Sequence, residues 1–219
     1  MTKTKVFLVY DHPIVRQGLK QLVNHQADLV TCGEAADAAS ALEGIEHLKP
    51  DVLVVDISLA GRSGFDLIKA LKTKSRDLPA LVLSMHDEEL YAERALRAGA
   101  RGYIMKEEAP ENLVEAIRLI LKGEVYLSRK MSSLLLKRLS KTDGSLRGSP
   151  LELLSDRELE VFQSIGQGKS TRQIAVQFNL SVKTIETYRA HIMEKLDLED
   201  ARSLVQYAVQ SLQSDPHFR

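Results

Sequence analysis

Short apolar runs alternate with amphipathic stretches through the first 125 residues of the chain. The apolar runs, which are rich in β-branched residues, lie near 5–10, 29–34, 51–55, 80–84 and 102–105. The stretches at 13–25, 37–48, 64–73, 88–98 and 111–122 repeat apolar residues every three or four positions, as helices packed on one face do. Runs that are apolar on both faces are typical of buried parallel strands. The alternation therefore predicts an α/β domain with a doubly wound sheet of five parallel strands in a flavodoxin-like order.

Four of these strand-like runs end at a polar residue that suits phosphate chemistry: Asp11, Asp56, Ser84 and Lys106. Because ligands bind beyond the carboxyl ends of the strands in such sheets, the four side chains are expected at one edge. Two carboxylates suit Mg²⁺, and Asp56 could act as a nucleophile. Ser84 and Lys106 would donate to phosphoryl oxygens. A single polar strand end is ordinary, but the four together favour a phosphorylation site.

After residue 150 the pattern becomes helical throughout. Ser155 and Glu158 form a capping box, and Ser170 and Gln173 repeat it before a second short helix. A tight turn at 179–181 leads to a third helix, and a fourth follows at about 200–212. Two short capped helices around a tight turn are typical of a helix-turn-helix, whose second helix enters the major groove of DNA. The sequence predicts an all-α domain of four helices.

The third helix, 182–196, separates into two faces. Ile185, Tyr188, Ile192 and Leu196 follow the helical spacing and should pack inward. The candidates for contacts with bases and phosphates are Lys183, Thr184, Glu186, Thr187, Arg189, Ala190 and His191. Glu186 could accept a hydrogen bond from cytosine N4. A merely solvated face is the alternative, but the capped helix and tight turn before it favour DNA binding.

Charge is distributed unevenly, although the whole chain has a formal net charge of zero. The predicted domains are 1–125 and 151–219, and the segment 126–150 between them has six basic residues and one acidic residue. We interpret this segment as a solvated tether with room for a short helix at 131–139, rather than as a phosphate-binding element. The C-terminal domain has ten acidic and eight basic residues, so dimerisation should be needed for firm DNA binding.

Composition excludes several classes of protein. No apolar stretch approaches the roughly 18–20 residues of a membrane span, and no signal peptide begins the chain. The single cysteine, Cys32, has no partner for an intramolecular disulfide and is expected in the core. These features favour a cytoplasmic protein that does not bind membranes.

The N-terminal domain resembles the receiver domain of two-component response regulators. The residues that carry the resemblance are Tyr10-Asp11-His12-Pro13, Asp56 followed by Gly64, Ser84, and Gly102-Tyr103-Ile104-Met105-Lys106. The resemblance implies that a sensor histidine kinase phosphorylates Asp56 and that Mg²⁺ binds to Asp11, Asp56 and the backbone carbonyl of Ser58. It also implies roles for Ser84 as the switch hydroxyl, Lys106 as the phosphate-binding lysine and Tyr103 as an aromatic residue that changes rotamer on activation.

The C-terminal domain resembles the LuxR-type helix-turn-helix of NarL/FixJ response regulators. The matching runs are Leu154-Ser155-Asp156-Arg157-Glu158-Leu159-Glu160-Val161, Gly168-Lys169-Ser170, Ile174-Ala175, Leu180-Ser181-Val182-Lys183-Thr184-Ile185 and His191-Ile192-Met193-Glu194-Lys195-Leu196. The resemblance implies a recognition helix at 182–196 and a homodimer contact through the last helix, where Leu204, Val205, Ala208 and Leu212 form an apolar stripe. A transcription regulator that binds two-fold symmetric DNA sites as a dimer, and no enzyme, is the expected function.

One position departs from the receiver pattern. The family usually has two adjacent acids after the first strand, and here the first of them is Tyr10. Loss of that carboxylate is expected to weaken Mg²⁺ binding. The alternative function is therefore a phosphorylation-independent regulator whose receiver serves as a dimerisation module. A phosphatase-like enzyme is disfavoured, because such an enzyme would need an acid at the position of Ser58.

Overall fold

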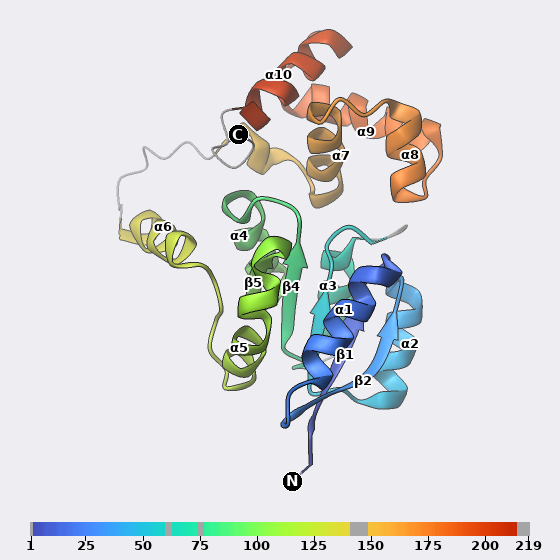
Figure 1. The fold of residues 1–219 in the computed structure, drawn as a ribbon. Coiled ribbons are helices and arrows are strands. Elements are labelled where there is room, and N and C mark those ends of the chain that lie inside the picture. The colour runs from blue at the N-terminus through green and yellow to red at the C-terminus, as the bar shows by residue number, and fades with distance from the viewer. Residues whose placement is uncertain (1, 60–62, 74–76, 141–148, 214–219) are drawn as a thin grey trace. The chain divides into compact units, whose positions relative to one another are not determined.

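The computed structural model describes residues 2–59, 63–73, 77–140 and 149–213. The chain divides into two compact units, 1–141 and 142–219, which are described separately (Figure 1). None of the helices within the described residues is long and apolar enough to cross a membrane.

The first unit is built on one sheet of five parallel strands in the order β2-β1-β3-β4-β5. The strands are β1 (Thr4–Val9), β2 (Leu29–Ala35), β3 (Val52–Val55), β4 (Ala80–Ser84) and β5 (Gly102–Met105). This order confirms the doubly wound, flavodoxin-like α/β fold expected from the sequence. The strand β3 is buried along its whole length, as its continuous apolar run predicts.

Helices cover both faces of the sheet (Figure 1). They are α1 (Pro13–Asn24), α2 (Ala38–Leu48), α3 (Gly64–Thr73), α4 (Glu88–Ala98) and α5 (Ala109–Leu121), with a short 3₁₀ helix, η1 (Lys106–Glu108), before α5. On the face covered by α1 and α5, one hydrophobic core joins residues of both helices to side chains of β1, β3, β4 and β5. Tyr10 belongs to this core.

The chain after α5 returns to the edge of the sheet. Tyr126 forms an isolated bridge with Gly102, and the Tyr103 amide donates to the Tyr126 carbonyl (3.0 Å). The helix α6 (Arg129–Ser140) then packs against α4, where the Ser128 amide donates to Glu88 (2.9 Å) and Lys130 pairs with Glu89 (2.7 Å). The sequence predicted a solvated tether here. The N-terminal part of that segment is instead docked on α4, and residues 141–148 lie outside the described residues.

The second unit is helical, as expected. Its elements are η2 (Pro150–Leu153), α7 (Asp156–Gly166), α8 (Thr171–Phe178), α9 (Val182–Lys195) and α10 (Ala201–Gln213). Both capping boxes predicted from the sequence are present, at Ser155–Glu158 and at Ser170–Gln173. The helix α8 ends at Asn179, whose left-handed φ of 52° makes the tight turn into α9.

Candidate functional site

The polar residues after β1 and β3 lie side by side. Val9 pairs with Val55 in the parallel register, and the Asp56 amide donates to the Val9 carbonyl (3.0 Å). The strands β4 and β5 follow in order, with Ser84 paired to Met105. The sheet therefore brings Asp11, Asp56, Ser84 and Lys106 to the same carboxyl edge, where ligands of such sheets bind.

Asp56 and Lys106 form an ion pair at this edge. The Lys106 Nζ lies 2.9 Å from Asp56 Oδ2, and Asp56 Oδ1 accepts from the Ser58 amide (3.3 Å). The Asp56 side chain is 2% exposed and that of Lys106 is 19% exposed. Burial lowers the pKa of Lys106 to about 8, whereas the adjacent carboxylate favours its charged form. The pair places a nucleophilic oxygen and a positive charge together in a place of low exposure.

Gly64 allows Asp56 to sit where it does. A Cβ atom at residue 64 would lie 2.0 Å from the Asp56 carbonyl oxygen, and the Gly64 amide donates to the Ile57 carbonyl (2.8 Å). Only a residue without a side chain can approach the backbone of the strand end this closely. The Asp56…Gly64 spacing of the receiver pattern thus has a steric reason.

Ser84 and Tyr103 both contact His86, in the loop between β4 and α4. The Ser84 Oγ accepts from the His86 amide (3.1 Å), and the Tyr103 hydroxyl donates to the His86 carbonyl (2.6 Å). Tyr103 is fully buried, and this burial raises the pKa of its phenol well above the usual value. Ser84 and Tyr103 are therefore both linked to the residue that precedes Asp87, the N-cap of α4.

His86 also lies at the site, although it was not predicted from the sequence. Its Nε2 lies 2.9 Å from the Ser58 Oγ, and its ring stacks on Tyr91 with centroids 4.6 Å apart. Ser58 thus contacts the site through its side chain and its amide, in addition to the carbonyl considered from the sequence. The available signal was the position of His86, two residues beyond the polar end of β4.

The oxygen atoms at the strand ends suit Mg²⁺. The ion usually takes one or two carboxylates and retains several waters, so Asp11, Asp56 and the Ser58 carbonyl form an adequate donor set. Asp11 Oδ1 lies 2.7 Å from the Nδ1 of His12. Within the described part of the chain, no three His, Cys, Asp or Glu side chains group as a metal cage of their own. Tyr10 has no carboxylate to offer the ion, and its side chain is buried in the core.

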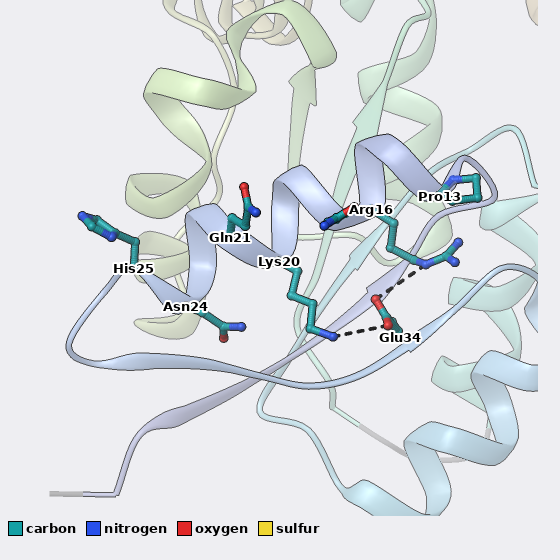
Figure 2. Close-up of a pocket in the computed structure, with 8 residues that line it drawn as sticks. Pro13, Arg16, Lys20, Gln21, Asn24, His25 and Glu34 are labelled. Atoms are coloured by element: carbon teal, nitrogen blue, oxygen red, sulfur yellow. Dashed lines mark hydrogen bonds and ion pairs between the residues drawn. The ribbon is translucent and has the colours of Figure 1, made fainter.

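A polar groove runs along α1, beside the strand end that leads to Asp11. Figure 2 shows Arg16 and Lys20 reaching toward Glu34 of β2, at 3.6 Å and 3.4 Å. Arg16 also donates to the Tyr10 carbonyl (2.5 Å). These contacts hold the end of β1, and with it the loop that carries Asp11.

In the second unit, α9 is the predicted recognition helix. Ile185 and Ile192 are buried, as the helical spacing predicted. Four of the seven candidate contact residues are exposed and lie one helical turn or less apart along one face, namely Lys183, Glu186, Thr187 and Ala190. We call these four residues the outer stripe.

The other three candidates have different surroundings. Thr184 and Arg189 are half-buried, and the Thr184 amide and hydroxyl both contact the N-cap Ser181 Oγ (3.0 and 2.7 Å). His191 is exposed, but its Nδ1 lies 3.8 Å from Glu158 Oε1 of α7. Thr184 therefore belongs to the N-terminal cap of α9, whereas His191 lies beside a residue of α7.

Glu158 connects the start of α7 with the end of α9. The carboxylate is buried and accepts from the Ser155 amide (2.7 Å) and from Lys195 Nζ (2.6 Å). Burial by itself raises the pKa of Glu158, but the hydrogen bonds from Lys195 and Ser155 outweigh it and leave the pKa below its usual value. The charged form is therefore the stabilising one.

Glu158→Gln is expected to lower the free energy of unfolding by about 1–3 kcal/mol near neutral pH, because Lys195 loses the charge of its buried partner. A carboxylate with a lowered folded pKa stabilises the protein above its unfolded pKa, and this stabilisation is lost as pH falls through the folded value. The difference between wild type and variant should thus shrink below about pH 4.5. Urea unfolding across pH measures it, with exposed Glu194→Gln as the control. A difference that is independent of pH would contradict the role of the charge.

The apolar stripe of the last helix is mostly core. Leu204, Ala208 and Leu212 are buried within the unit, whereas Val205 is 40% exposed. A Cβ atom at Gly166 would lie 2.6 Å from the Ala208 carbonyl, so α7 and α10 are in close contact. Of the four residues in the apolar stripe of α10, Val205 is the one left for contact with a second molecule.

Both parts of the chain are similar to known families. Residues 6–118 match the response regulator receiver domain, and residues 152–208 match the luxR family of bacterial regulatory proteins. The oxygen regulatory protein NreC of Staphylococcus haemolyticus is 36% identical over 209 residues, which are 94% of this chain and 96% of the relative. NreC of Staphylococcus carnosus is 35% identical with the same coverage.

Solved structures of response regulators are similar as well. The RcsB response regulator of Salmonella typhimurium is 27% identical with a TM-score of 0.67, over 96% of this chain and 98% of that one. RcsB of Salmonella enterica serovar Typhimurium, bound to promoter P1flhDC in the presence of the phosphomimetic BeF₃⁻, is 28% identical with a TM-score of 0.58, over 95% and 100% of the two chains. ChrA, the response regulator of a heme-sensing two-component system, is 31% identical with a TM-score of 0.52, over 96% and 98%.

Proposed function

This chain belongs to the two-component response regulators that join a receiver domain to a LuxR-type DNA-binding domain, and from that membership we propose that phosphorylation of Asp56 by a sensor histidine kinase switches its binding to DNA. The family consists of transcription regulators rather than enzymes. The observation that carries the proposal is the buried Asp56 carboxylate with Lys106 Nζ 2.9 Å away at the carboxyl edge of the sheet. A regulator of this kind is expected in the cytoplasm, where its DNA is.

Each residue at the edge has a role in this reaction. A carboxylate oxygen of Asp56 attacks the phosphorus atom, and the donor group leaves. Mg²⁺, when bound by Asp11, Asp56 and the Ser58 carbonyl, would neutralise charge on the transferred group. Lys106 is already at hydrogen-bond distance from Asp56 and can exchange the carboxylate for a phosphoryl oxygen with a small movement.

The same residues connect the reaction to the surface of the receiver. To donate to the phosphoryl group, Ser84 must move toward Asp56, and its contact with the His86 amide changes. We expect Tyr103 to change rotamer into the space that this movement leaves, and its hydrogen bond to the His86 carbonyl then breaks. Because Asp87 caps α4, both changes alter the surface formed by α4 and β5.

DNA binding is assigned to α9, with the outer stripe facing the bases and phosphates. The RcsB structure with promoter DNA supports this assignment, because its chain is similar to this one over 95% of the length. The net acidic composition of the second domain means that one copy gains little from phosphate neutralisation. A homodimer on a two-fold symmetric site supplies two copies of α9, and we propose that the exposed side of α10 near Val205 takes part in the contact.

Incubation of the full chain with acetyl phosphate and Mg²⁺, followed by intact mass and sedimentation of the same samples, tests the proposal. A mass gain of one phosphoryl group together with a shift from monomer to dimer is the expected result. Omission of Mg²⁺ should abolish the gain. An unmodified mass under all conditions would contradict phosphorylation.

The second candidate function is a regulator that binds DNA without phosphorylation and uses its receiver for dimerisation. The observation that favours it is the loss of a carboxylate at Tyr10, whose side chain belongs to the core. An unmodified mass with a dimer already present would support this candidate.

A further inference from the structure

Tyr10, the residue between the end of β1 and Asp11, is fully buried. Alternation along β1 places Tyr10 on the same face as Val6 and Leu8, in the core beneath α1 and α5. Among the residues that the structure describes, the buried Tyr10 hydroxyl has no hydrogen-bond partner. A buried hydroxyl without a partner costs free energy, so the hydroxyl gives no reason for a tyrosine here. The remaining feature of the side chain is its ring.

The ring lies under the ammonium group of Lys106. The Lys106 Nζ is 4.5 Å from the centroid of the Tyr10 ring, within the range of a cation–π interaction. The same Nζ is 2.9 Å from Asp56 Oδ2. The ammonium group is therefore held by a carboxylate and by the face of an aromatic ring. Because the Lys106 side chain is 81% covered, water screens this attraction less than it would at the surface.

We propose that Tyr10 is a positioning residue for the phosphate-binding lysine, and that its ring supplies to Lys106 the attraction that an acid would supply at this position. The inference rests on the proposed role of Lys106 in phosphorylation. A ring attracts a cation over a broad area of its face, in contrast to a carboxylate, which bonds in specific directions. Lys106 can therefore move from Asp56 toward a phosphoryl oxygen and remain over the ring throughout.

A tyrosine at position 10 therefore has a different effect from the mere loss of a carboxylate there. Without the ring, the Lys106 ammonium group, which has low exposure to water, would keep its ion pair with Asp56. It would then hold the Asp56 nucleophile more firmly. The ring instead keeps the ammonium at the strand edge while the carboxylate reacts. Tyr10 removes a possible outer ligand of Mg²⁺, but it holds the lysine that would contact the phosphoryl group on Asp56.

Fluorination of the ring separates its charge distribution from its shape. In the full chain, we would compare Tyr10→Phe, Tyr10→Leu and Tyr10→pentafluorophenylalanine, with Phe7→pentafluorophenylalanine as the matched control. Phe7 lies on β1, three residues before Tyr10, and is buried on the opposite face, against Gly33 and Gly44. Melting temperatures of all variants show whether the fold is kept.

Two measurements report on the position and role of Lys106. The first is the initial rate of phosphorylation by acetyl phosphate at saturating Mg²⁺. Tyr10→Phe should keep the rate, and the pentafluorinated ring should lower it by up to roughly 30-fold, the effect expected for loss of a desolvated cation–π contact. The second is the upfield ring-current shift of the Lys106 ε-methylene protons without Mg²⁺ or donor, which should persist in Tyr10→Phe and disappear in Tyr10→Leu.

Equal rates in the phenylalanine and pentafluorophenylalanine variants, or unshifted Lys106 protons in the wild type, would overturn the inference. If the wild type takes up no phosphoryl group, the proposed function fails. The ring-current shift then still decides whether Tyr10 holds Lys106, because it needs no phosphorylation. If Tyr10→Leu does not fold, the fluorinated variant carries the test by itself.

Discussion

Asp56→Asn is expected to abolish the uptake of a phosphoryl group from acetyl phosphate, while the receiver unit stays folded. The amide is not a nucleophile, so no covalent phosphate can form. The substitution preserves size at a residue with 1% exposure, and the amide oxygen can still accept from Lys106 Nζ. Intact mass measures the uptake, and thermal unfolding monitored by circular dichroism measures the fold.

Asp66→Asn is the matched control for this experiment. Asp66 lies in the first turn of α3, in the same unit, and is exposed. This variant should take up one phosphoryl group at the rate of the wild type. If Asp56→Asn still gains the mass of a phosphoryl group, the acceptor is another residue, and the assignment from the strand ends is wrong.

The arrangement of the carboxyl edge of the sheet could be predicted from the sequence, because it depends on the alternation of strands and helices along the chain. Parallel strands joined by helices expose their carboxyl ends at one edge, so the polar residue after each apolar run had to lie there. The ion pair between Asp56 and Lys106, which are 50 residues apart, is a direct consequence. The helix caps at Ser155 and Ser170 were equally local features, and both are present.

Contacts that depend on the paths of loops and on long-range packing could not be predicted in this way. His86 reaches Ser58 only because the loop after β4 bends toward the end of β3. The basic segment that begins α6 was interpreted as a tether, since no local signal shows that Met131 is buried and that Lys130 meets Glu89. Charge composition describes how a segment interacts with water, but not which neighbouring helix it contacts.

Tyr10 illustrates the same difference within one side chain. The sequence showed that Tyr10 occupies the first of the two acidic positions of the receiver pattern, and that a carboxylate is lost there. The alternation of Val6, Leu8 and Tyr10 also indicated a buried face. Lys106 follows β5, which is three places from β1 in the sheet. Its position over the Tyr10 ring depends on the three-dimensional arrangement of β5 and η1.

Ala190→Glu is expected to remove most sequence-specific DNA binding without loss of stability. Ala190 is exposed on the outer stripe of α9, one turn beyond Glu186 and Thr187, so the new carboxylate would face DNA and not the core. Repulsion from phosphates and the loss of close approach to the bases should lower the affinity at least roughly tenfold. Fluorescence anisotropy would measure this with a duplex that the phosphorylated wild-type chain selects from a random-sequence pool.

The same substitution at a different helix separates an effect of the stripe from an effect of net charge. Ala201 is exposed at the start of α10, where a carboxylate is favoured by the helix dipole. Ala201→Glu adds the same charge to the domain but lies one turn before Val205, so sedimentation must first show that this variant still dimerises; it should then bind the selected duplex nearly as well as the wild type does. Equal losses in the two variants would mean that overall charge controls the affinity. Unchanged binding by Ala190→Glu would mean that another face of the domain meets the DNA, because a glutamate cannot be accommodated without cost between α9 and the floor of the major groove.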